Sequence, residues 1–221
     1  MVFHTSPSST DQTNSWTHGY AMGLKRPIDN RVTWAPAAGI VQTQQYGAGN
    51  ITNLTNEINR AKANLDGYTE TNRILAKTSN KPSTSYPACY YAVTYSVTYP
   101  KSSSGWYLPS VGQIYYLFNN AKSNSYSLIS VYAQASGSNT RIGISSSNGS
   151  TLASIITSKL SSLSAGDYTW GDSYHIWLSS ECSSEWGLIF YFGNAPDGLW
   201  YIYPHYRKAI ENAGVRSFIA F

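Results

Sequence analysis

The stretch Gly105-Trp106-Tyr107-Leu108-Pro109-Ser110-Val111-Gly112-Gln113 leads into the clearest helix signal of the chain. Ser110 can cap a helix, and Gln113 stands three residues later, which is the spacing of a capping box. Pro109 prevents the helix from beginning earlier. An apolar stripe with helical spacing follows, made by Val111, Ile114, Leu117, Phe118 and Ala121. The sequence therefore predicts a helix from Ser110 to Lys122 that buries one face.

Other segments before residue 170 also have helical spacing. Asn53 to Leu65 is predicted as a helix that Gly67 ends. Ser150 to Leu163 fits a further helix. Tyr86 to Tyr99 fits both a helical face and the alternation of a strand, and we favour the helix.

Strands are predicted near both ends of the chain. His18 to Leu24 alternates enough for an early strand. From Tyr174 onward the pattern is β, with a last strand from Val215 to Phe221. Alternation within Trp186–Phe192 points Trp186, Leu188, Phe190 and Phe192 inward and Gly187, Ile189 and Tyr191 outward. Helices followed by a compact antiparallel sheet predict an α+β fold.

The composition favours one well-packed domain. Hydrophobic residues make up 42% of the 221 residues, enough for a sizeable core, while charged residues make up only 12%. The 19 tyrosines suit a surface that binds through aromatic faces and neutral hydrogen bonds. Residues 1–15 are polar and lack periodicity, so we expect an N-terminal arm or linker, which could pack on a second copy. Residues 16–221 form the expected single domain.

Several classes of partner are not expected. The net charge is +4 without a run of like charges, so no nucleic-acid stripe is predicted. The N-terminus has no signal-peptide pattern, and no stretch approaches the ~18 apolar residues of a membrane helix, so no membrane insertion is expected. Cys89 and Cys182 could pair, but we favour an unpaired Cys89 on a helix and an unpaired Cys182 at the surface.

A set of short motifs is spread over residues 17–221. They are His18-Gly19-Tyr20, Asp66-Gly67-Tyr68, Thr71-Asn72-Arg73-Ile74, Gly105 to Ser110 with Gly112-Gln113, Trp177 to Glu181, Trp186 and Val215 to Phe221. Together they resemble the fibrobacter-type, C-type-lectin-like domains of gut Bacteroidetes and their phages. The sequence departs from that pattern at Leu178, where Ser is usual, and at Glu185, where Ala is common.

The resemblance implies a C-type-lectin-like fold, in which two or more helices pack on a small twisted antiparallel sheet. It implies a stable frame that displays a variable surface. In some relatives a diversity-generating retroelement rewrites the segment between the tryptophan-serine-glutamate and valine-arginine motifs. Other relatives lie at pilus tips or on phage particles, so an extracellular surface or a virion is the expected location.

The segment between those two motifs is rich in aromatic residues with polar tips. Such side chains supply contact area at low entropy cost and suit sugar rings and protein epitopes. The residues expected to bind a cell-surface glycan or protein are Tyr174, Cys182, Tyr191, Tyr201, Tyr203, His205 and Tyr206.

A second set of residues is expected to hold the frame. It comprises Trp106, Trp177, Glu181, Trp186 and Arg216, with Glu181 accepting backbone N–H groups and Arg216 anchoring a loop or a carboxylate. No metal, cofactor or catalytic residue is predicted, because the chain lacks the calcium-lectin motifs, metal-ligand spacings and nucleophile motifs.

Three functions follow in order of preference. The first is a non-enzymatic ligand-binding domain of the receptor or adhesin type, with an aromatic-rich surface. The alternative is a structural phage head-fibre, decoration or pilus subunit that uses the same fold for assembly. The third is an enzyme of the formylglycine-generating type, for which Cys89 and Cys182 lack a supporting motif.

Overall fold

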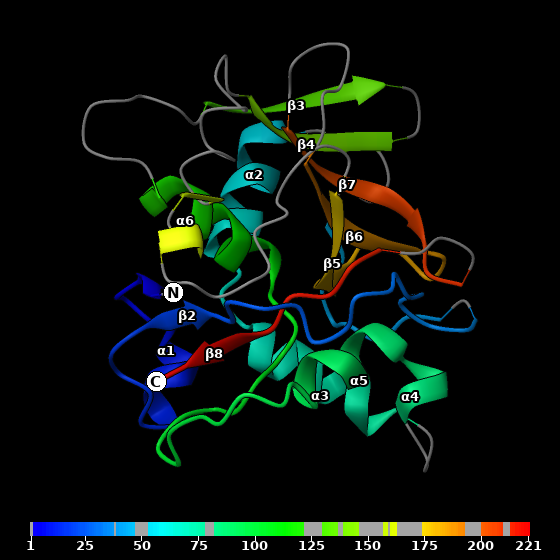
Figure 1. Ribbon diagram of the computed structural model, residues 1–221. Coiled ribbons are helices and arrows are strands. Elements are labelled where there is room, and N and C mark those ends of the chain that lie inside the picture. The colour runs from blue at the N-terminus through cyan, green and yellow to red at the C-terminus, as the bar shows by residue number, and fades with distance from the viewer. Residues whose placement is uncertain are drawn as a thin grey trace.

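A computed structural model gives the fold, an α+β arrangement of helices around two antiparallel sheets (Figure 1). It describes residues 2–37, 39–46, 53–77, 82–121, 130–136, 139–145, 157–158, 160–162, 174–192, 200–209 and 213–221. In residues 130–136, 139–145 and 200–207, and at 54, 82, 118, 121, 174 and 192, only the backbone is described. The α+β prediction is confirmed.

The smaller sheet joins the two ends of the chain. Its strands have the order β1-β2-β8, with bounds Val2–His4, Tyr20–Met22 and Phe218–Ala220. Both outer strands run antiparallel to β2, so they are parallel to each other. The N- and C-termini lie near one another on this side of the molecule (Figure 1). The other edge of β8 is bonded to Tyr107, whose backbone N–H and C=O both pair with Phe218 at 2.9 Å.

The larger sheet has the order β3-β4-β7-β6-β5, and each neighbouring pair is antiparallel. The strand bounds are Ser130–Ser136, Asn139–Ser145, Trp200–Arg207, Trp186–Phe192 and Tyr174–Glu181. The outer edge of β5 is covered, because Trp177 N–H donates to Gly214 C=O at 3.0 Å and Ser179 N–H donates to Pro109 C=O at 2.8 Å. The sequence did not predict the β3–β4 hairpin.

Apart from α1, which lies beside the smaller sheet, the labelled helices form two groups in Figure 1: α3, α4 and α5 lie together at the bottom, and α2 and α6 lie beside the larger sheet. Their bounds are Ser9–Thr13 for α1, Leu54–Ala63 for α2, Gly67–Ala76 for α3, Pro82–Ser85 for α4, Pro87–Val93 for α5 and Val111–Ala121 for α6. None of the helices described is both long and apolar enough to cross a membrane.

Two hydrophobic clusters cover the two faces of the larger sheet at β5 and β6. The first core cluster includes Ile114, Leu178 and Phe190, and the second includes Trp177 and Ile189. Neighbouring residues of one strand alternate between them, as Leu178 and Trp177 do. Strands β5 and β6 are therefore buried on both faces, whereas the sequence pattern predicted one buried face for β6.

The predicted helices formed with shifted ends. Helix α6 matches the predicted Ser110–Lys122 segment, and Gln113 Oε1 accepts the Ser110 N–H at 3.1 Å as in a capping box. The Ser110 hydroxyl instead donates to Asn64 C=O at 2.7 Å, which ties α6 to the end of α2. Gly67 was predicted to end α2, but it begins α3. The predicted helix at 150–163 falls largely outside the described residues.

The first fifteen residues are not a detached arm, and that prediction is wrong. Strand β1 pairs with β2 and places Phe3 in the first core cluster. Asp11 is buried, and its Oδ2 accepts the Tyr20 hydroxyl at 2.6 Å. The segment packs on its own chain because Phe3 finds an apolar partner in Phe218, with ring centroids 5.0 Å apart. A homo-oligomer formed through these residues stays a prediction.

Candidate functional site

The predicted binding residues other than Cys182 lie on the three strands β5, β6 and β7. Backbone register places His175 opposite Tyr191 and Tyr191 opposite Tyr201, so a row crosses the three strands. The side chains of Tyr174, Tyr201, Tyr203, His205 and Tyr206 lie outside the described residues, so their roles as ligand contacts stay predictions.

His175 and Tyr191 form the described part of this row. Their rings stack with centroids 4.6 Å apart and an interplanar angle of 22°, and both side chains are half-buried. Burial, helped by the positive charge of Arg31, lowers the pKa of His175 to about 4. The imidazole is therefore neutral at physiological pH and offers a flat, uncharged surface. Tyr191 also packs against the second core cluster, so part of its ring serves the frame.

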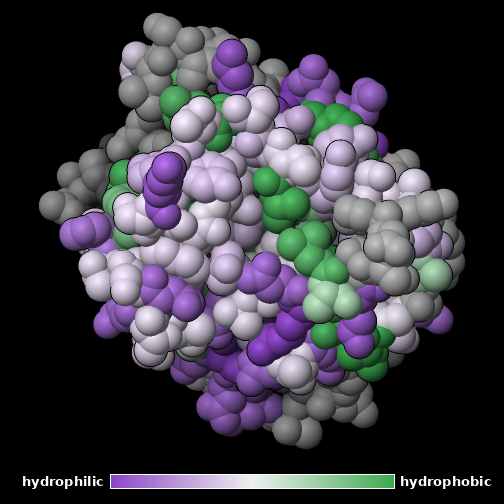
Figure 2. All heavy atoms as spheres, turned by 90° about the horizontal axis from the view of Figure 1, so that it is seen from below, coloured by the Kyte–Doolittle hydropathy of each residue, from purple (hydrophilic) through white to green (hydrophobic). Residues whose placement is uncertain are grey.

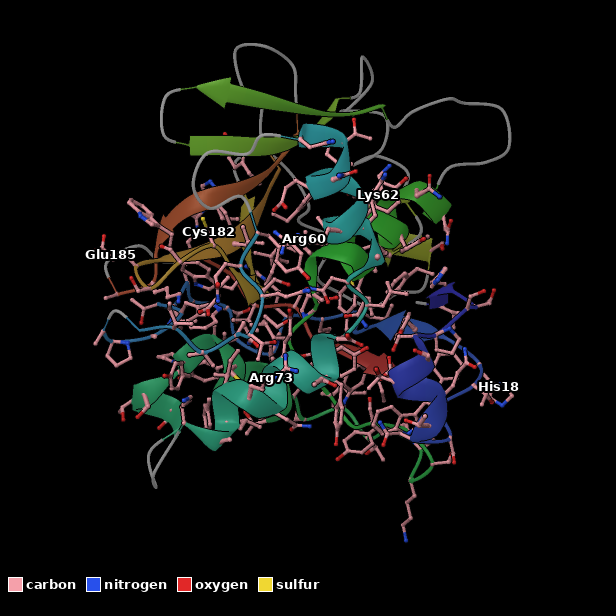
Figure 3. The ribbon with its side chains drawn as sticks, turned by 180° about the vertical axis from the view of Figure 1, so that it is seen from behind. His18, Arg60, Lys62, Arg73, Cys182 and Glu185 are labelled. Carbon is pink, nitrogen blue, oxygen red and sulfur yellow. The ribbon has the colours of Figure 1, made fainter. Side chains whose placement is uncertain are left out.

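The structure contradicts three of the exposure predictions, because Gly187, Ile189 and Cys182 are all buried. Ile189 was predicted to point outward, yet it is fully buried in the second core cluster. Cys182 was predicted as an exposed binding residue, yet it is only 6% exposed. Its backbone N–H donates to Trp186 C=O at 2.9 Å, and the turn after β5 folds its side chain into the first core cluster. Figure 3 labels Cys182 and Glu185 in this region, and of the two only Glu185 is exposed.

Glu181, at the end of β5, is a buried anchor. Its Oε1 accepts the backbone N–H groups of Val41 at 2.9 Å and Gln42 at 2.6 Å, contacts of the kind that the sequence predicts for a frame residue. Its Oε2 pairs with Lys208 Nζ at 2.5 Å, and both side chains are almost completely buried. Lys208 Nζ also donates to Gly39 C=O at 2.9 Å and Ser183 C=O at 2.8 Å.

The surroundings of Lys208 explain how a buried ammonium is tolerated. Its Nζ lies 4.6 Å from the centre of the Trp34 ring, and Trp34 Nε1–H donates to Leu178 C=O at 2.8 Å. Burial lowers the pKa of Lys208, while the hydrogen bond and charge of Glu181 act against that shift. The loop at residues 39–42, β5 and the segment after β7 are thus fixed to one another. No local signal in the sequence marked Lys208.

Glu70 forms a second buried cluster beneath β5. Its Oε2 accepts the hydroxyls of Ser179 at 2.6 Å and Ser180 at 2.8 Å, and its Oε1 accepts Asn64 Nδ2–H at 2.8 Å. Burial raises the pKa of Glu70, and these hydrogen bonds partly oppose the shift. Ser180 Oγ also accepts the Val111 N–H at 3.1 Å. The cluster therefore joins α3, the end of α2, the start of α6 and β5.

The side chains of the other frame residues differ in how far they are buried. Trp177 is completely buried, and its Nε1–H donates to Val32 C=O at 2.6 Å. Arg216 is almost completely buried and anchors a loop, because its Nη1–H donates to Leu24 C=O at 3.1 Å. Trp186 is half-buried against the first core cluster. Trp106 is half-buried at the surface and donates from Nε1–H to Val97 C=O at 2.7 Å.

Candidates for a reactive site in the described part of the chain are the possible metal ligands and the two cysteines. Within those residues, no three His, Cys, Asp or Glu side chains come together as they would around a metal ion. Both cysteines are free and buried. Burial raises the pKa of Cys89 to about 12 and that of Cys182 to about 11, so both thiols are protonated and weakly nucleophilic.

Comparison with known proteins identifies a structural relative. No known protein family and no curated protein matches the sequence. The fold is similar to the crystal structure of a fimbrial protein from Bacteroides ovatus ATCC 8483, with a TM-score of 0.60 and 17% sequence identity. The match covers 98% of this chain and 39% of that protein, so this chain spans about two fifths of its length. At this identity the similarity establishes a shared fold.

Proposed function

We propose that this chain is a non-enzymatic domain of a fimbria-type surface protein, and that its first role is assembly into the surface structure. The observation that supports the proposal is the match of 98% of the chain to part of a Bacteroides fimbrial protein. Of the two roles that the sequence suggests, this similarity favours the assembly subunit over the ligand-binding domain. Its location would be the bacterial surface.

The packing of charged residues is compatible with a structural role. Glu181, Lys208 and Glu70 are buried and use their polar atoms to fix loops and helices to β5. Groups bound in this way are poorly available for acid–base chemistry on a substrate. We therefore propose binding, and no chemical transformation, as the activity of the chain.

Surface fractionation tests the assembly role. The chain, carrying an epitope tag at an exposed position such as Lys101, would be expressed in a fimbriated Bacteroides strain. We expect the tag in the high-molecular-weight appendages released by mechanical shearing, and on unpermeabilised cells under immunogold labelling. A matched strain that lacks the fimbriae should release none. Retention of the tagged chain inside the cell would contradict the proposal.

Recognition of a glycan or protein on a C-type-lectin-like frame is the second candidate. The row of His175, Tyr191 and Tyr201 across three strands favours it, because adjacent aromatic residues suit a stacking surface. The resemblance of the sequence motifs to lectin-like domains supports the same reading.

A pair of tyrosine variants tests recognition. Tyr191→Ala removes the described ring of the row, and Tyr115→Ala removes a half-buried tyrosine on α6 as the matched control. With both variants folded by circular dichroism, binding to host cells and to a glycan array should fall at least tenfold for Tyr191→Ala alone. Equal binding by the two variants would reject the row as the recognition surface.

A further inference from the structure

A cavity of about 320 Å³ lies beside the smaller sheet, away from the row on β5–β7. One wall is β2 and the residues after it, from Ala21 to Lys25, and the other wall is formed by Tyr95, Val97 and Trp106. A volume of this order is near the lower end of small-ligand pockets and suits one large side chain. Trp106 is the one predicted frame residue in its lining, and the proposed function does not use the cavity.

The aromatic wall is fixed in place. Trp106 donates its indole N–H to Val97 C=O at 2.7 Å, and the Tyr95 ring meets Trp106 edge-on with centroids 5.0 Å apart. A Cβ atom on Gly23 would lie 2.7 Å from Tyr95 Cε1, so the ring rests directly on the backbone of that glycine. The cavity is therefore preformed, and an occupant would need to order little of it.

Three polar groups around the cavity already have partners. The Tyr95 hydroxyl accepts the Lys25 N–H at 3.1 Å, and the Leu24 carbonyl accepts from Arg216 at 3.1 Å. The indole N–H of Trp106 is bonded to Val97. A sugar ring would require several unengaged hydrogen-bonding groups, whereas Met22, Leu24 and Val97 offer apolar surface. The lining selects an apolar group.

The rim adds one charge and a wider apolar surface. Lys25 is exposed and is the one charged residue among those that line the cavity. Around the opening, Val2 is 57% exposed, Val97 44% and Tyr99 43%. Val2 pairs with the cavity residue Ala21, and the Tyr99 ring lies 6.3 Å from that of Trp106. Exposed apolar residues gathered in this way indicate a protein contact larger than a small molecule would cover.

We propose that this cavity receives an aliphatic side chain of a partner protein, with a neighbouring carboxylate of the partner at Lys25. The walls supply the apolar contact, Lys25 supplies the charge complementarity, and the exposed residues at the rim widen the interface. The cavity borders β2, the middle strand of the smaller sheet, and the exposed residue Val2 lies on the neighbouring strand β1.

Amide shifts in NMR spectra of the whole ¹⁵N-labelled chain test the proposal with small probes. N-acetyl-leucine should give saturable shifts at Gly23, Leu24, Lys25 and Val97. N-acetyl-leucinamide, which lacks the carboxylate, should bind about two- to fivefold more weakly, the range expected for an exposed ion pair. N-acetylglucosamine should leave these amides unshifted. Absence of saturable shifts with N-acetyl-leucine, or stronger binding of the sugar, would overturn the proposal.

Variants connect the shifts to the cavity. Lys25→Glu should abolish the preference for N-acetyl-leucine over its amide, whereas Lys101→Glu, an exposed lysine outside the lining, should retain it. Ala21→Phe should fill the cavity from β2 and remove binding, whereas Ile40→Ala, at an exposed apolar residue outside the lining and the rim, should not. Unchanged binding by the Ala21→Phe variant would place the probe elsewhere.

Two controls separate the other occupants. A concentration-dependent dimer in sedimentation runs that N-acetyl-leucine dissociates would identify a second copy as the occupant and overturn the assignment to a different protein. Octanoate that binds more than tenfold more tightly than N-acetyl-leucine would identify a lipid site and overturn it as well. A monomer with weaker octanoate binding supports the proposal.

Discussion

Single buried residues hold together segments that are far apart in the sequence. Glu181 and Lys208 are 27 residues apart, and Glu70 and Ser179 are 109 apart. The motif around Trp177 drew attention to Glu181, but nothing in the local sequence pointed to Lys208 or Glu70. A pairing of this kind leaves no periodic pattern, so the sequence could suggest that Glu181 is buried without naming its partner.

The Glu181–Lys208 pair yields a stability prediction. Lys208→Ala should lower the free energy of unfolding by about 3–5 kcal/mol, because it leaves a buried carboxylate without its cation. Lys101→Ala, at an exposed lysine, should stay within about 0.5 kcal/mol. Urea denaturation measures both. A loss below about 1 kcal/mol for Lys208→Ala would show that the pair is solvated.

His175 yields a titration prediction. Histidine-selective NMR should find its pKa near 4, since burial and the charge of Arg31 disfavour the imidazolium. Because the folded pKa lies below the unfolded value of about 6.5, the contribution of His175 to stability is complete above pH 6.5 and is lost as the pH falls toward about 4. Arg31→Gln should move the pKa upward. A pKa that stays near 6.5 in the wild type would contradict the observed burial.

At the scale of elements, local patterns predicted some structure and missed the rest. Helix α6 was predictable because a cap, a preceding proline and an apolar stripe all lie within thirteen residues. Strand β6 has large apolar residues on both faces, with Leu188 and Phe190 on one and Ile189 on the other. The alternation of residues along this strand therefore could not distinguish a buried face from an exposed one. Because Tyr191 shares the face of Ile189, its prediction as an exposed residue depended on the same assumption.

The contact between α6 and the end of α2 yields an element-scale prediction. A Cβ on Gly112 would lie 2.3 Å from Asn64 O and 2.6 Å from Lys62 O, both backbone atoms. Gly112→Ala should therefore separate the two helices and lower the free energy of unfolding by about 3 kcal/mol.

Gly39→Ala is the matched control, because a Cβ there would meet no atom within 4 Å. It should change the thermal unfolding midpoint by little. Equal midpoints for the Gly112→Ala and Gly39→Ala variants would contradict the close approach of α6 and α2.

At the scale of the whole molecule, the composition predicted a well-packed domain with few charges. Figure 2 shows one face of it, where hydrophobic residues gather in a band among weakly polar ones. The N-terminal segment was mistaken for an arm because its apolar residues form one short run, Met1 to Phe3, ahead of a polar stretch, and a single run makes no periodic pattern. Its burial depends on β2 and β8, which are formed by distant parts of the chain.

The position of Phe3 tests whether the first residues belong to the fold. Phe3→Ala should lower the free energy of unfolding by about 3–5 kcal/mol, because it empties a site in the first core cluster. Val2→Ala, one residue away and exposed, should stay within about 0.5 kcal/mol. Denaturant titrations measure the free energy of unfolding of both variants. Equal unfolding curves for the two variants would show that the first residues do not belong to the fold.

The parallel arrangement of β1 and β8 on either side of β2 has a mechanical consequence. A chain pulled at Val2 and at Phe221 in opposite directions would slide the outer strands along β2. The backbone hydrogen bonds on both sides of β2 would then bear the load together. If a strand were instead peeled off from one end, these bonds would break one at a time. Resistance to tension is thus built into the way the two ends of the chain are tied together.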